Sequence, residues 1–335
     1  MNTRILRQYA RILLGTAALI ALGACGGGDG DSNLSGGITY TGNANPAILT
    51  TANGADLITG AYTAGANGSS IGSVAGTLDA PESGGTAPAR PFALYQSLNA
   101  LMARLSPAAV SASSTARAVQ SRSETLPSEE GCGGNLTPTG NAQISFSYDD
   151  VTGDFDGSAV FNAYCAEGES LSGSATLSGR INVATSDFIS MTISTHNLTV
   201  ISGSDNYTIN GEVSVDPGAS SQTVNMDLLI QDNISGKTVW LNNFTLTVTA
   251  GIDSELISAH GRYYNPDEGY VILATPSPLQ IMHVDDWPSS GSLTVTGANG
   301  KATLTALSNT VYRVDVDLGD DGSVESTVTG NWADL

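Results

Sequence analysis

Apolar residues recur at every second position through most of residues 131–335. The alternating sets include Ile144, Phe146 and Tyr148; Ile189, Met191 and Ile193; Val224, Met226, Leu228 and Ile230; Phe244, Leu246 and Val248; Leu293 and Val295; and Tyr312, Val314 and Val316. A period of two places apolar side chains on one face of a β-strand and polar ones on the other. The pattern predicts a mainly β domain over residues 131–335, an antiparallel up-and-down meander that forms a curved sheet, a sandwich or a barrel.

Turn-forming dipeptides separate several of these runs. Asn299-Gly300 is the strongest hairpin signal, because this dipeptide favours the type I′ turn that joins antiparallel strands. Asp321-Gly322 and Ser235-Gly236 are weaker signals of the same kind. Asn210-Gly211 is ambiguous, because the apolar alternation keeps the same parity on both sides of it. A turn and one long strand both fit that segment.

Residues 38–130 are rich in small side chains, and one segment has a helical period. Four leucines form an apolar stripe between Pro91 and Pro107, at positions 94, 98, 101 and 105. This spacing predicts one amphipathic helix over residues 91–105. We expect its stripe to cover an edge or open face of the protein's own sheet, or to dock onto a partner. Residues 106–130 lack an apolar period, so we expect a linker there.

Two weaker elements precede that helix. Residues 38–40 read as a short strand, and Thr51 is a candidate cap for a helix that continues through Leu57 to Tyr62. Gly54 and Gly60 argue against this second helix, because glycine in a helix interior is destabilising.

The amino terminus has the three parts of an export signal. Basic residues are followed by a short apolar run, residues 12–22, and then by Leu22-Gly23-Ala24-Cys25. This quartet resembles the lipobox of bacterial lipoprotein precursors. The resemblance implies a signal peptide over residues 1–24, cleavage before Cys25, and acylation of that cysteine, with palmitate among the attached chains. An ordinary secretory signal and an uncleaved membrane helix are the alternatives, but the run is shorter than the ~20 residues of a spanning helix.

Residues 25–37 are dominated by glycine and read as a flexible tether behind the lipidated Cys25. In lipoproteins of this kind an Asp directly after the cysteine favours retention in the inner membrane. Gly26 at that position implies, by resemblance, a lipid anchor in the outer membrane, with the body periplasmic or surface-exposed. The body also loosely resembles Gly-rich bacterial lipoproteins that carry the segment seen here at residues 38–42 and end in an acidic turn followed by a Trp, as at Trp332. That likeness brings no activity with it.

The charge balance narrows the classes of partner. The chain has 12 Lys and Arg against 32 Asp and Glu, a net charge of −20. Such a surface repels phosphates, so nucleic acid is excluded as a partner and protein charge does not attract anionic lipid heads. Charged residues are only 13% of the chain and hydrophobic residues 40%, so a sizeable core is expected rather than a disordered polyelectrolyte.

Of the 3 cysteines, the lipid anchor uses Cys25. Cys132 and Cys165 remain, and in an oxidising exported setting an even pair reads as one disulfide. Two buried thiols are the alternative. Neither cysteine has a Cys or His at metal-ligand spacing, so no metal pair is expected.

Candidate chemistry is sparse. His283, Asp285 and Asp286 lie close together beside Trp287, which suits an acid–base or sugar-stacking site, although a solvated loop is the plainer interpretation. Residues 262–270 form a tyrosine-rich hairpin that could bind carbohydrate or simply pack across strands.

The densest acidic run contains Asp315, Asp317 and Asp321 and is the only candidate metal site. Placing Gly322 at the sixth position of an EF-hand loop puts Gly319 and Val328 at ligand positions, so two ligands fail. We therefore expect a structural hairpin turn at Asp321-Gly322 whose carboxylates face solvent.

These observations favour a membrane-anchored envelope lipoprotein that acts as a non-enzymatic binding or structural module and needs no cofactor. Its partners would be the lipid bilayer, through acylated Cys25, and an envelope protein or polysaccharide. A hydrolase of envelope glycans or esters centred on His283, Asp285 and Asp286 is the alternative.

Overall fold

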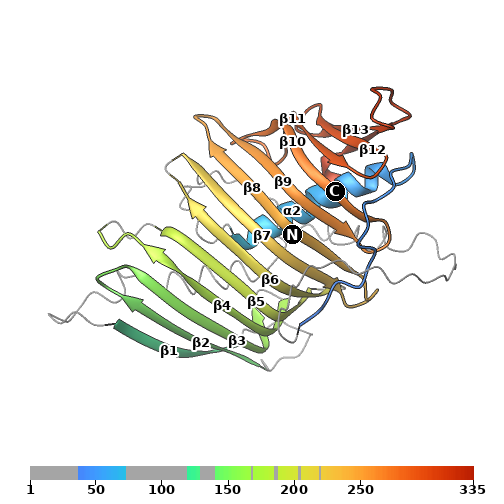
Figure 1. Cartoon of the computed structure of the whole chain (residues 1–335). Helices are drawn as coiled ribbons and strands as arrows, with labels where there is room; N and C mark the ends of the chain where they lie inside the picture. The colour runs from blue at the N-terminus through green and yellow to red at the C-terminus, as the bar shows by residue number, and fades with distance from the viewer. Residues whose placement is uncertain are drawn as a thin grey trace.

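The computed structural model describes residues 37–72, 119–128, 140–166, 169–184, 188–202, 205–218 and 220–335. These residues form one sheet of fourteen antiparallel strands in which each strand pairs with the next along the chain, and one long α-helix near the N-terminal side. The predicted mainly β meander is confirmed, as a curved sheet (Figure 1). The predicted signal peptide, most of the tether and the helix predicted at residues 91–105 lie outside the described residues.

The strands occupy most of the chain beyond residue 118. They are β1 (Val119–Pro127), β2 (Asn141–Asp149), β3 (Asp154–Ala166), β4 (Glu169–Ile181), β5 (Phe188–Ser202), β6 (Asp205–Pro217), β7 (Ser221–Asp232), β8 (Thr238–Ala250), β9 (Ser254–Asn265), β10 (Gly269–Met282), β11 (Ser290–Thr296), β12 (Gly300–Ala306), β13 (Val311–Leu318) and β14 (Ser326–Asn331).

β1 corrects the predicted boundary of the β domain. It lies inside the segment interpreted as a linker over residues 106–130, and it pairs with β2 along its whole length. The segment was missed because it lacks apolar alternation. An edge strand joins a sheet through backbone hydrogen bonds to one neighbour, and needs no apolar face of its own.

The alternation predicted from sequence sets the two faces of the sheet. In β13, Tyr312, Val314 and Val316 are buried on the inner, concave face, and the residues between them point outward. Ile189 is the exception among the predicted sets: it keeps the parity of Met191 and Ile193 but is 49% exposed at the end of β5.

A row of irregularities lets the strands bend. The pairing of β5 with β6 shifts register next to Asn197, and that of β7 with β8 shifts at Asp227. Gly211 of β6, which pairs with Leu228 of β7, has φ +135°, and an added Cβ there would lie 2.0 Å from the carbonyl oxygen of the neighbouring Asp227. Bulges of this kind increase local twist and bend a sheet. β6 therefore runs through Asn210-Gly211 as one long strand, which decides between the two predicted alternatives.

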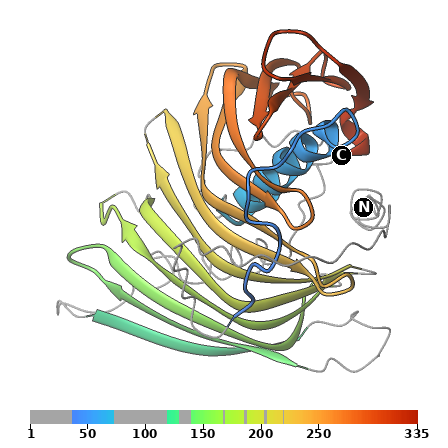
Figure 2. The same ribbon diagram turned by 45° about the vertical axis from the view of Figure 1, so that its right-hand side comes forward.

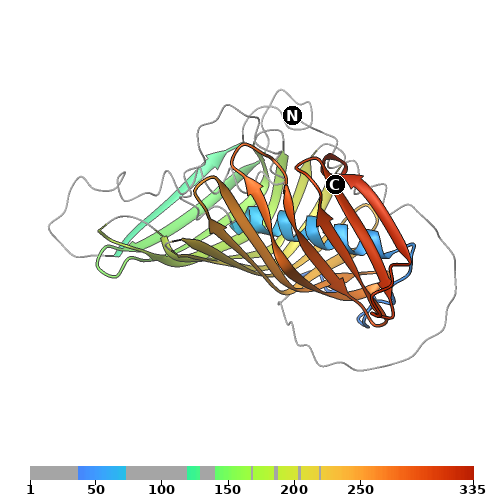
Figure 3. The same cartoon turned by 90° about the horizontal axis from the view of Figure 1, so that it is seen from above.

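α2 (Gly54–Gly72) crosses the inner side of the curved sheet, as Figures 2 and 3 show. Its residues Leu57, Ile58 and Ala61 are fully buried. At Gly65 an added Cβ would lie 2.6 Å from the Phe244 ring, so glycine lets the helix approach β8 closely. The helix is longer than the predicted segment ending at Tyr62, because close packing on the sheet offsets the low helix propensity of its glycines.

The helix begins with a reciprocal cap, one residue before the predicted one. The Asn53 backbone N–H donates to Thr50 Oγ1 at 3.1 Å, and the Thr50 backbone N–H donates to Asn53 Oδ1 at 2.8 Å. Two free backbone donors are thereby satisfied, as in a capping box. The prediction of Thr51 as the cap was wrong.

Residues 37–49, which we call the N-terminal strap, lead from the outer face of the sheet to α2. The strap adds no strand, so the strand predicted at residues 38–40 does not form. Its Tyr40 ring packs on Trp240 and Tyr264, with ring centroids 5.9 and 5.4 Å apart. Farther along, the Ala47 N–H donates to the Tyr270 carbonyl at 2.7 Å. The strap thus passes the hairpin ends of the sheet, and the chain continues into the concave side.

The C-terminus fills the other end of the concave side. Trp332, in the short 3-10 helix Trp332–Asp334, is fully buried and lies against Tyr62 of α2 and Tyr312 of β13, at centroid distances of 5.4 and 5.0 Å. Its indole N–H donates to the Ser308 carbonyl at 2.9 Å. The last residues of the chain therefore join the helix to the sheet.

Candidate functional site

His283, Asp285 and Asp286 lie in the loop between β10 and β11. His283 and Asp286 are exposed, and Asp285 Oδ1 accepts a hydrogen bond from Asn309 Nδ2 at 2.7 Å. Within this loop no hydrogen bond or ion pair joins the imidazole to either carboxylate. Trp287 turns inward and stacks on Trp332 with an interplanar angle of 5°. Its indole is partly buried and packs against the core.

The tyrosine-rich hairpin at residues 262–270 packs across strands. Tyr263 faces α2, and burial raises its pKa to about 12. Tyr264 faces outward and stacks on Trp240 at 4.6 Å, beneath Tyr40 of the strap. The Arg262 guanidinium lies 5.3 Å from the Tyr270 ring centroid, within cation–π distance. The hairpin was predicted either to bind carbohydrate or to pack across strands. Its rings pack across strands, and Trp240 and Tyr40 cover Tyr264.

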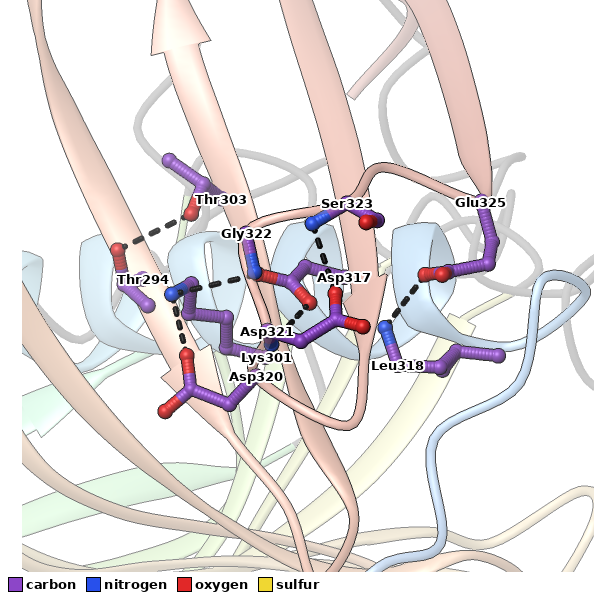
Figure 4. Close-up of polar contacts among 10 residues, drawn as sticks. All are labelled: Thr294, Lys301, Thr303, Asp317, Leu318, Asp320, Asp321, Gly322, Ser323 and Glu325. Atoms are coloured by element: carbon purple, nitrogen blue, oxygen red, sulfur yellow. Dashed lines mark hydrogen bonds and ion pairs between the residues drawn. The ribbon is translucent and has the colours of Figure 1, made fainter.

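The acidic loop between β13 and β14 is a hairpin connection, as predicted (Figure 4). Asp317, however, does not face solvent. Its side chain is only 7% exposed, and its two carboxylate oxygens accept the backbone N–H groups of Asp321 and Gly322 at 3.2 and 3.1 Å. The buried carboxylate holds the turn closed, which corrects the expectation that the acidic side chains of this loop are all solvated.

Lysine neutralises this carboxylate. Lys301 Nζ, on β12, lies 3.4 Å from Asp317 Oδ2 and also pairs with exposed Asp320. A hydrogen bond to Asp320, and to a smaller extent one to Asp317, raises the pKa of Lys301. The lysine and the two backbone donors satisfy Asp317, so its oxygens are already occupied by protein groups.

The other two candidate metal ligands point elsewhere. Asp315 pairs with Arg313 at 2.8 Å and accepts the Thr327 hydroxyl at 2.8 Å. Asp321 accepts the Ser323 N–H at 2.8 Å, and this bond lowers the pKa of Asp321. Among the described residues, no group of three or more His, Cys, Asp or Glu side chains is placed to hold a metal ion. The run of carboxylates is therefore distributed over separate structural contacts.

Cys165 is buried near the end of β3 and is disulfide-bonded. Cys132 and Cys25 lie outside the described residues, so the pairing of Cys132 with Cys165 stays a prediction. The Cys165 backbone N–H donates to Ser128 Oγ at 2.9 Å, which links β3 to the residue that follows β1.

The outer face of the sheet carries small hydroxyl side chains at paired positions. Ser123 pairs with Ser145 and Ser145 with Ser158, while Ser121 pairs with Ser147. A groove of about 550 Å³ lies among them on β1, β2 and β3. These serines were not predicted as a site from the sequence. The sequence does place serine at alternate positions in neighbouring segments. This pattern indicates a shared surface only once the pairing of the strands is known.

Comparison with protein-family models, with curated proteins and with solved structures finds no match to this chain. No described helix combines the length and the apolar character needed to cross a bilayer.

Proposed function

We propose that the protein is an outer-membrane lipoprotein, anchored through acylated Cys25, that acts as a non-enzymatic binding or structural module of the cell envelope. The proposed binding or structural role is supported by the contrast between the two faces of the sheet. The concave face is apolar and is occupied in part by α2 and Trp332, whereas the outer face presents polar side chains over many strands. A broad polar face of this kind suits contact with an extended partner.

The location of the candidate catalytic groups supports a binding role over hydrolysis. A general acid or base must reach the substrate proton within hydrogen-bond distance, and a nucleophile and its base must meet. His283 and Asp286 are exposed, and Asp285 is hydrogen-bonded to Asn309. The described residues of this loop supply no such pairing, so we do not propose hydrolysis.

The anchor rests on the sequence of residues 1–37. A Gly-rich tether behind Cys25 would span about 5–6 Å times the square root of its length, roughly 20 Å. It would reach the strap at Gly37, which lies against Asn210 of β6 on the outer face. The folded body would then be attached to the membrane through the tether and the N-terminal strap.

The test is Cys25→Ser in cells supplied with a fatty-acid analogue, followed by membrane fractionation. We expect the variant to lose the label and to leave the membrane fraction. Cys132→Ser is the matched control, because it removes a cysteine without touching the lipobox, and it should keep the label. A Cys25→Ser protein that is still labelled and still sediments with membranes would contradict the proposal.

A further inference from the structure

Most of the residues that line the groove on the outer face of β1, β2 and β3 are serines. Its walls are the side chains of Ser121, Ser123, Ser145, Ser147, Ser158 and Asp156, and its floor is made where Phe146 and Gly157 pair. Phe146 belongs to the inward-facing set of β2, so it contributes backbone to this side. The groove therefore presents serine hydroxyls among apolar atoms, and Asp156 is the charged residue among the described ones that line it.

The hydroxyls of the groove suit a partner that both donates and accepts hydrogen bonds. Each serine hydroxyl can do either. Ser145 Oγ and Ser158 Oγ lie 2.8 Å apart and bond to each other, so each keeps a free capacity toward the groove. Asp156 is exposed and adds an acceptor. Sugar hydroxyls are both donors and acceptors, and they match this set.

An apolar side chain borders the same wall. Val160 follows Ser158 by two residues on β3, so both lie on the outer face, and Val160 is 42% exposed. A pyranose ring has an apolar C–H face as well as a hydroxyl edge. A sugar bound with its hydroxyls on Ser145 and Ser158 would have a place for its C–H face at Val160.

Charge selects between neutral and acidic glycans. The chain carries a net charge of −20, and among the described residues that line the groove the charged one is Asp156, a carboxylate. An acidic glycan would be repelled by the protein as a whole and by Asp156 in particular. The polar face also extends beyond the groove, because Ser158 pairs with Thr176 of β4 and Thr176 with Ser194 of β5. A polymer could follow this row across the strands.

From these contacts we propose that the groove binds a neutral polysaccharide, with Ser145, Ser158 and Asp156 as hydrogen-bonding residues and Val160 as the apolar contact. The inference rests on the proposed binding function and names its ligand class. It does not depend on the lipid anchor, so the two can fail separately.

The experiment applies the full-length lipoprotein, purified in detergent, to an array of neutral and acidic oligosaccharides. We expect binding to neutral glycans only. The glycan that binds best is then titrated against Ser145→Ala and Asp156→Ala, each of which removes the hydrogen-bonding group. Each should weaken binding about threefold to tenfold, since a net hydrogen bond contributes about 0.5–1.5 kcal/mol. Ser158→Arg, which fills the groove, should abolish binding.

The matched control is Thr294→Ala. Thr294 faces the same side of the sheet on β11 and bonds through its hydroxyl to Thr303 of β12, 3.4 Å away, far from the groove. The Thr294→Ala variant should bind the neutral glycan as tightly as the native protein does. Circular dichroism should show that every variant is folded. Binding to no neutral glycan, a preference for acidic glycans, or equal binding by Ser158→Arg would each overturn the inference, and none of these results bears on the Cys25 labelling test.

Discussion

The substitution Asn299→Asp separates two explanations of the Asn299-Gly300 hairpin. The sequence favours a type I′ turn, which needs positive φ at both central residues. In the structure neither residue has a positive φ. The Asn299 side chain instead clamps the strap: Oδ1 accepts the Leu49 N–H at 2.7 Å, and Nδ2 donates to the Leu49 carbonyl at 2.9 Å.

The cost of the substitution follows from these two bonds. A carboxylate still accepts the Leu49 N–H, but it cannot donate to the Leu49 carbonyl, which becomes an unsatisfied, partly buried acceptor facing a negative charge. Such a loss costs about 1–3 kcal/mol, and we expect about 2 kcal/mol at neutral pH. A type I′ turn predicts almost no cost, because Asp-Gly is also favoured in that turn.

The assay is urea unfolding of the purified protein at pH 7 and at pH 4. The introduced carboxyl should have a raised pKa in the folded state, because its charged form faces the Leu49 carbonyl. A raised folded-state pKa means that its stabilising, protonated form is fully present below the unfolded pKa of about 3.9 and is lost as the pH rises through the folded value. The destabilisation should therefore be smaller at pH 4 than at pH 7.

Asn182→Asp is the matched control. It makes the same change of charge, but Asn182 is exposed and its Oδ1 only accepts the Ala184 N–H at 2.9 Å, which a carboxylate does equally well. We expect a change within about 0.5 kcal/mol. Equal unfolding midpoints for the two variants would refute the clamp.

Three further outcomes are expected. Trp332→Ala should lower the free energy of unfolding by about 3–5 kcal/mol, because the indole is fully buried; a loss below about 1 kcal/mol in denaturant unfolding would show that the C-terminus does not close the core. Reduction should shift the electrophoretic mobility of the mature protein through Cys132 and Cys165, whereas alkylation of both thiols without reductant would exclude their disulfide. Calorimetry should find Ca²⁺ affinity no tighter than the millimolar range, since Asp317 is occupied by backbone donors; micromolar binding that is lost in Asp317→Asn would contradict this.

The alternation of apolar residues was enough to predict the class of fold and most strands, because a half-buried strand must place its apolar side chains on one face. β13 shows this directly, with Tyr312, Val314 and Val316 all buried. The hairpins at Ser235-Gly236 and Asp321-Gly322 were predicted from these turn-forming dipeptides. In these elements the determining interactions lie within a few residues of the chain.

Tertiary contacts determine several features that the local sequence pattern does not predict. β1 has no apolar alternation and exists by pairing with β2, and α2 persists through its glycines because the sheet packs closely on it. Asp317 is buried because Lys301, on another strand, and two turn amides satisfy its charge. Asn299 holds Leu49 from 250 residues away in sequence. The outer-face groove likewise needs three strands in register. Each of these features joins residues that the sequence separates, so its energy appears only when the sheet has formed.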